Sequence, residues 1–201
     1  MLKSIDLGKT AILFMDFVND VVHPEGKFAA MGVAAHLEQT RTIENAEKAL
    51  VAARTKGLPV IHVRVAFRPG HRELNGDVPF WAGVIQGDAL VEGTWGTEFL
   101  KALAPVENEV VMIKRGVSAF NDTELARYLT FKGIQTLVLA GVATNWVVEA
   151  TTRDAADLGY TLVVLQDCCG SFNEELHSFS VQNILGSLAT LTTANEFATA
   201  P

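Results

Sequence analysis

The stretch Thr10-Ala11-Ile12-Leu13-Phe14-Met15-Asp16 decides the fold of this chain. It is a short, nearly continuous apolar run that ends in a carboxylate. Such runs are typical of strands that are buried on both faces of a parallel sheet, where neither side of the strand meets water. We therefore predict a buried parallel strand over residues 10–16, with Asp16 at its carboxyl end.

Similar apolar runs and intervening helical segments follow along the chain. Further strands are predicted at residues 59–65, 109–113, 135–140, 160–166 and, on a weaker pattern, 189–193. Helices are predicted at residues 37–56, 123–132 and 145–158, and each is followed by a glycine suited to a left-handed stop (Gly57, Gly133 and Gly159). Strands alternating with helices predict an α/β fold: a doubly wound, mainly parallel six-stranded sheet with helices on both faces, in a three-layer, Rossmann-like arrangement.

Length and composition restrict the classes of protein to which the chain can belong. Its 201 residues predict one domain, residues 1–201. Apolar residues make up 49% of the chain, yet no run reaches the ~18 residues of a membrane span. The N-terminus lacks the pattern of a signal peptide, and a net charge of −7 without a basic cluster argues against nucleic acids and anionic membranes as partners. We expect a cytoplasmic protein that binds neither.

The histidines and cysteines indicate neither metal nor redox chemistry. The five histidines show no close metal-ligand spacing, so we expect no metal and no cofactor. The two cysteines, Cys168 and Cys169, are adjacent, and a disulfide between neighbours is too strained for an ordinary structural bridge. No histidine or lysine adjoins them to lower the pKa of a thiol. Buried structural cysteines are the favoured interpretation.

Residues 66–100 have no clear periodicity and contain two prolines and six glycines. A connection of this length inside a compact domain is usually functional. We predict a loop that forms a wall of the binding pocket, with a short helix near residues 97–103. Its aromatic residues Phe67, Trp81 and Trp95 are candidates for substrate binding.

Several polar features fall at the carboxyl ends of the predicted strands, where the sites of doubly wound sheets collect. They are Asp16, Lys114, the turn 141–147 and Cys168. A carboxylate at the end of an apolar strand caps a local turn, pairs with a cation or transfers protons. Lys114, beside an arginine, is either a solvated strand end or a partner of Asp16. The pattern therefore predicts that these features share one rim of the sheet.

The turn carries the signature Gly141-Val142-Ala143-Thr144-Asn145, followed by Trp146 and Val147. Local sequence rules do not decide the role of these residues. Thr144 or Asn145 could simply cap the following helix, and Trp146 fits a pocket wall or an interface equally well.

Five separate segments carry a family resemblance: residues 14–20 (FMDFVND), 60–64 (VIHVR), 93–98 (GTWGTE), 113–123 (beginning IKR) and 141–157. In this order and spacing, the chain from residue 9 to about residue 195 resembles the isochorismatase-like hydrolases, whose amidase members use an Asp-Lys-Cys triad. The resemblance implies that Asp16 and Lys114 are catalytic. The cysteine position of the triad corresponds to Val147, and many relatives carry glutamine where this chain has Val18.

The same resemblance implies how the turn is used. It implies a cis peptide bond between Val142 and Ala143, backbone N–H groups that form an oxyanion hole, and substrate contacts from Val142, Ala143, Thr144, Trp146 and Val147. The nicotinamidases of the superfamily hold a metal after their second strand, but this chain has arginines at residues 64 and 68 there. Relatives usually form dimers or larger assemblies, so the resemblance also implies a homo-oligomer.

Three functions remain in competition. The first is hydrolysis of a small, anionic molecule with Asp16 as general acid or base and without a cysteine nucleophile, because Val147 cannot attack a carbonyl. The second is a non-catalytic relative that keeps the pocket for binding or assembly. The third is an amidase or carbamoyl hydrolase that uses another nucleophile, such as Cys168 or Cys169.

Overall fold

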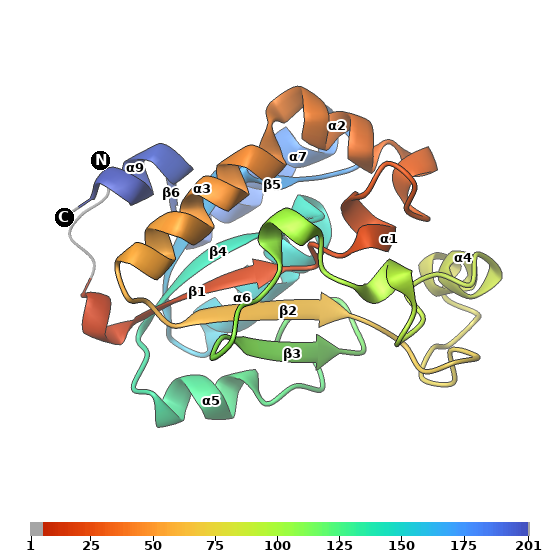
Figure 1. Ribbon diagram of the computed structural model, residues 1–201, viewed down its shortest axis with the longest axis horizontal. Helices are drawn as coiled ribbons and strands as arrows, with labels where there is room; N and C mark the ends of the chain where they lie inside the picture. Colours follow the sequence, from red (N-terminus) through yellow and green to blue (C-terminus); the bar gives the residue numbers. More distant parts are fainter. Residues whose placement is uncertain (1–5, 201) are drawn as a thin grey trace.

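The computed structural model describes residues 6–200 and contains the predicted six-stranded sheet (Figure 1). The strands are β1 (Thr10–Met15), β2 (Val60–Val65), β3 (Val110–Lys114), β4 (Thr136–Val142), β5 (Thr161–Gly170) and β6 (Thr190–Thr192). Their order is β3-β2-β1-β4-β5-β6, and every neighbouring pair is parallel. The predicted α/β class is confirmed, and the sheet of the described residues is wholly rather than mainly parallel.

Helices cover both faces of the sheet, as predicted. They are α1 (Asn19–Val22), α2 (Val33–Thr40), α3 (Thr42–Thr55), α4 (Pro79–Gln86), α5 (Leu125–Phe131), α6 (Glu149–Asp157), α7 (Glu174–Ser180), α8 (Gly186–Leu188) and α9 (Ala194–Thr199). Apolar residues of α2, α3 and α9 pack in one core cluster, while those of α5 and α6 pack in another. In Figure 1, α3 crosses one face of the sheet and α6 lies beyond the other.

The run in β1 is apolar throughout because its two faces meet different cores. Ile12 and Phe14 point into the α3 side, whereas Leu13 and Met15 point into the α5 side. Successive side chains of a strand alternate between faces, so a strand buried on both sides needs apolar residues at every position. This alternation explains why residues 10–15 decide the fold.

Several expectations about secondary structure were wrong in detail. The helix predicted over residues 37–56 is two helices, separated by Arg41 in the left-handed conformation with φ of 55°. Thr40 promotes the break, since its hydroxyl bonds to the His36 carbonyl and to the Thr42 hydroxyl. β5 continues beyond residue 166 to Gly170, so Cys168 and Cys169 lie within the strand.

The segment 66–100 is not all loop, because it contains α4, which has a proline in its first turn. In place of the helix predicted near residues 97–103 there are two 3₁₀ turns, Trp95–Thr97 and Lys101–Leu103. The helix α7 was not predicted, although its start has a recognisable sequence pattern. Asn173 caps it by accepting a hydrogen bond from the Leu176 N–H, and two glutamates occupy its first turn.

We expect Gly141→Ala to destabilise the fold by roughly 1–3 kcal/mol, the usual range for overpacking a core. A Cβ at Gly141 would lie 2.9 Å from both the Cβ and the carbonyl oxygen of Met15 on the neighbouring strand. Urea denaturation measures the loss. The matched control is Gly83→Ala in α4, where an added Cβ meets no atom within 4 Å and helix propensity favours alanine; equal stability of the two variants would contradict the expectation.

Candidate active site

A cavity opens at the carboxyl ends of β1, β3 and β4. The volume that the centres of water molecules can occupy inside it is about 60 Å³. This is room for roughly four to six waters, and hence for one small organic molecule. Its lining consists of Asp16, Val21, Phe28, Val33, Val65, Phe80, Trp81, Leu90, Lys114, Gly116, Val117, Val142, Ala143, Trp146, Val147 and Phe172. Asp16, Lys114 and Val147 therefore converge on one cavity, as their strand-end positions predict.

Asp16 and Lys114 form an ion pair in this cavity. The Lys114 Nζ lies 2.8 Å from Asp16 Oδ2, and the two residues are only 2% and 4% exposed. Asp16 Oδ1 accepts a second hydrogen bond of 2.7 Å from the Val65 N–H, and the ammonium also donates to the Gly116 carbonyl at 2.8 Å. Asp16 has φ of 60°, which turns the chain sharply after β1. Asp16 is thus held by Val65 of the neighbouring strand β2, and Lys114 by the connection that follows its own strand β3.

Burial and pairing act on the Asp16 carboxyl in opposite directions. Loss of solvent raises its pKa, while the Lys114 ammonium and the Val65 N–H lower it. Burial is the larger effect, so the pKa of Asp16 lies above its ordinary value. A carboxyl of this kind is suited to hold and release a proton nearer to neutral pH than an exposed aspartate.

The turn after β4 supplies another wall of the cavity. The Val142–Ala143 peptide bond is cis, which is the geometry that the signature sequence predicted. A π-helical turn, Thr144–Val148, follows and continues directly into α6. The Trp146 ring stacks on Phe80 with centroids 4.1 Å apart, so it is a pocket residue. Val147 is buried and presents only an aliphatic side chain to the cavity.

Three residues predicted to bind substrate do not line this cavity. Phe67 is fully buried and packs its ring against Trp81. Trp95 is 45% exposed and makes an edge contact with the His23 ring. Thr144 is fully buried, with its hydroxyl turned to His177. Sequence shows that an aromatic or polar residue is in the right segment, but not the direction of its side chain.

Much of the apolar lining was missed by the sequence analysis. Val21 and Val33 come from α1 and α2, Phe28 from the connection between them, and Phe172 from the segment after β5. No periodic pattern identifies them, since each belongs to a short helix or an irregular connection. Phe80 lies in the helix α4, which the sequence analysis did not predict.

The two cysteines are separate from the cavity. Cys168 and Cys169 are at most 1% exposed and neither lines it. Burial, the largest influence, raises the pKa of the Cys169 thiol to about 12 and that of the Cys168 thiol well above its usual range, and Asp167 adds to both effects. A thiol with so high a pKa is a poor nucleophile near neutral pH. The prediction that they are structural residues agrees with this environment.

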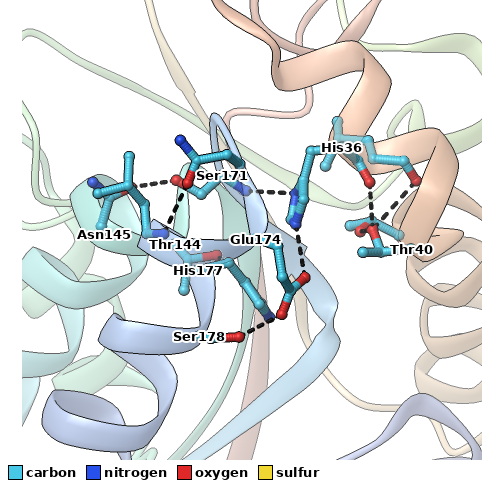
Figure 2. Close-up of polar contacts among 12 residues, drawn as sticks. His36, Thr40, Thr144, Asn145, Ser171, Glu174, His177 and Ser178 are labelled. Atoms are coloured by element: carbon cyan, nitrogen blue, oxygen red, sulfur yellow. Dashed lines mark hydrogen bonds and ion pairs between the residues drawn. The ribbon is translucent and has the colours of Figure 1, made fainter.

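A polar network supports the turn from the side away from the cavity (Figure 2). Thr144 Oγ1 lies 2.8 Å from His177 Nδ1 of α7, and Ser171 Oγ donates to Asn145 Oδ1. The Ser171 N–H donates to His36 Nδ1 at 3.2 Å. Since that nitrogen accepts, the other ring nitrogen of His36 carries the proton that faces Glu174 at 3.2 Å. The network explains why Thr144 and Asn145 face inward rather than serving as simple helix caps.

The network predicts a pH dependence of stability. Burial, and to a lesser extent the charge of His36, lowers the pKa of His177 below its ordinary value of 6.5. The unfolded chain therefore binds this proton at a higher pH than the folded chain, and stability is lost as the pH falls below about 6.5. Burial acts on His62 in the same direction. We expect His177→Gln to lose less unfolding free energy than the wild type between pH 7 and pH 5 in urea titrations; an identical loss would contradict this.

A double-mutant comparison tests the ion pair. Lys114→Met leaves the buried Asp16 carboxylate without its cation, and we expect a loss of roughly 3–5 kcal/mol in the free energy of unfolding. In the double variant Asp16→Asn/Lys114→Met neither charge remains, while the asparagine oxygen can still accept from the Val65 N–H. We expect this variant to be more stable than Lys114→Met, as urea denaturation would measure. A double variant as unstable as the single one would show that the charges are not coupled.

Comparison with known proteins agrees with this architecture. The family model of the isochorismatase domain matches residues 10–196. The chain belongs to the isochorismatase family. Over 185 residues it is 32% identical to a maleamate amidohydrolase of Pseudomonas putida, covering 90% of this chain and 83% of the relative. A ureidoacrylate amidohydrolase of Agrobacterium fabrum is 28% identical over 200 residues, covering 92% and 87%. Both relatives are hydrolases, and this family member is a hydrolase.

Solved structures show the same fold. An isochorismatase-like hydrolase from Alkaliphilus metalliredigens superposes with a TM-score of 0.77 and 29% identity, covering 96% of this chain and 98% of its own. A cysteine hydrolase from Pseudomonas syringae pv. phaseolicola gives a TM-score of 0.85 at 24% identity, covering 98% and 94%, and supports the fold alone.

Residues 6–200 lack two further features. Within that range, no helix has the length and apolar character needed to cross a bilayer. In the same residues, no group of three or more histidine, cysteine or acidic side chains is arranged to hold a metal ion.

Proposed function

We propose that this isochorismatase-family hydrolase cleaves a small molecule by proton transfer from Asp16 and direct attack of water, without a covalent enzyme intermediate. The observation that carries the proposal is the buried Asp16–Lys114 pair in a cavity where Val147 occupies the wall beside it. The pair supplies a proton donor or acceptor, and the valine supplies no nucleophilic atom. Cys168 and Cys169 lie outside the cavity and do not replace a nucleophile there.

An enol ether or a comparably activated bond suits this set of residues. In the resting cavity Asp16 is ionised and paired with Lys114. In the proposed step, Asp16 takes up a proton from solvent and gives it to the terminal carbon of the double bond, and the adjacent carbon becomes an oxygen-stabilised cation. Water adds to that carbon and returns a proton to the Asp16 carboxylate. The resulting hemiketal collapses to an alcohol and a carbonyl compound. Burial raises the pKa of Asp16 and so increases the share of the carboxyl that carries the proton needed for this step.

Lys114 is assigned to positioning the Asp16 carboxylate and stabilising its charge. Its ammonium keeps the carboxylate in position, and it stabilises the negative charge that Asp16 acquires when its proton leaves. The backbone amides of the turn 143–147 are assigned to binding a substrate oxygen, since this turn forms the facing wall. Val142, Ala143, Trp146, Val147 and Trp81 are assigned to contacts with the rest of the substrate.

The two remaining interpretations are less well supported. A purely binding protein would gain nothing from an ion pair whose desolvation costs several kcal/mol per ion. The amidohydrolase relatives favour an amide as a second candidate substrate, cleaved by water that Asp16 activates as a base. Both chemistries use Asp16 and neither needs a thiol, so one variant tests both.

We expect Asp16→Asn to reduce turnover by roughly 10²–10⁴-fold, the usual contribution of a positioned general acid or base. The assay uses compounds from a panel of small enol ethers and amides that the wild type hydrolyses. Asp20→Asn is the matched control, because Asp20 is another buried carboxylate, accepts from the Leu90 N–H at 2.7 Å and does not line the cavity. Full activity of Asp16→Asn, or equal losses in both variants, would contradict the proposal.

A further inference from the structure

The charge inside the cavity is already balanced. In the part of the chain that the structure describes, Asp16 and Lys114 are the charged side chains of the lining, and they are bonded to each other. The prediction of an anionic substrate assumed that the Lys114 ammonium is available to it. A carboxylate entering this cavity would instead lie near the Asp16 carboxylate and would lose its hydration without gaining an unpaired cation.

Lys114 nevertheless has one donor to offer. An ammonium group has three N–H donors, and two are directed to Asp16 Oδ2 and the Gly116 carbonyl. The remaining donor suits one uncharged oxygen acceptor, such as a carbonyl or ether oxygen.

The remaining side chains of the inner wall are apolar, and five of them are aromatic. Phe80 stacks on Trp146 at 4.1 Å with the ring planes 24° apart, and it meets Trp81 at 4.9 Å in an edge contact. Aromatic walls favour flat apolar groups through offset stacking and edge contacts. Phe28 and Phe172 extend this surface around the cavity.

The approach to the cavity also disfavours anions. An outer groove shares Trp81, Gly116 and Val117 with the cavity and carries the carboxylates of Glu73, Asp122 and Asp154. Arg115 is the cation in the groove lining of the described residues, and it is engaged by Glu92 at 2.7 Å and Glu73 at 3.9 Å. A negatively charged ligand would therefore be repelled before it reached the inner site.

We infer that the site selects a small uncharged molecule with a flat apolar body and a single oxygen acceptor directed at Lys114, and that it discriminates against carboxylates. The inference rests on the proposed function only in taking this cavity as the substrate site. It replaces the small anions expected from the sequence with uncharged, ring-sized compounds as the substrate class.

Acetophenone and benzoate provide a matched pair of probes that the protein cannot hydrolyse. Both have a ring, one bridging carbon and a carbonyl oxygen. Acetophenone carries a methyl group where benzoate carries a charged oxygen. Calorimetric titration of the wild type should give a dissociation constant at least roughly tenfold lower for acetophenone, because the anion loses its hydration without a free partner. Tighter or equal binding of benzoate, or no binding of acetophenone, would overturn the inference.

The variant Asp16→Asn should change the selectivity in favour of benzoate. The variant leaves the Lys114 ammonium unpaired, so benzoate affinity should rise at least roughly tenfold while acetophenone affinity changes little. Unchanged benzoate affinity in a folded variant would contradict the role of charge balance.

The three tryptophans locate the bound probe. In ¹H–¹⁵N spectra, acetophenone should shift the indole signals of Trp81 and Trp146, assigned through the variants Trp81→Phe and Trp146→Phe. Trp95 lies outside the lining and serves as the internal control. A shift confined to Trp95 would overturn the inference. If Asp16→Asn retained full turnover while the probe selectivity held, the proposed mechanism would fail and the inference would stand.

Discussion

The ion pair between Asp16 and Lys114 is the interaction on which the site depends. Two charges this deeply buried are tolerated only because each meets the other and a backbone group, the Val65 N–H of β2 for Asp16 and the Gly116 carbonyl after β3 for Lys114. Those partners exist because β1, β2 and β3 end at the same edge of a parallel sheet. The strand order therefore determines both the stability of the pair and the position of its proton beside the cavity.

The surroundings of the pair determine what chemistry is available to it. Val147 closes one side without offering a nucleophile, and the aromatic wall around Trp146 forms another side of the ring-sized space. Burial raises the pKa of Asp16, while the neighbouring ammonium limits that rise. These surroundings support the proposed transfer of a proton by Asp16. The network behind Thr144 and Asn145 fixes the wall from its far side.

The sequence predicted the strands well, because each has to be apolar on both faces and ends where polar residues begin. Asp16, Lys114 and Val147 were predictable for the same reason, since strand ends locate them. Of the aromatic lining, Trp81 and Trp146 were predicted. Phe28, Phe80 and Phe172 were not, because they belong to segments without a clear period. Nor could a linear pattern show that the 141–147 turn directs Thr144 away from the cavity.

Intact-mass analysis of the protein, quenched during steady-state turnover of a hydrolysed compound, tests the absence of a covalent intermediate most directly. Because water attacks the substrate without prior bonding to the protein, the account predicts a single species at the unmodified mass throughout turnover. A transient species heavier by the mass of a substrate fragment, mapped to Cys168, Cys169 or any other side chain, would contradict it.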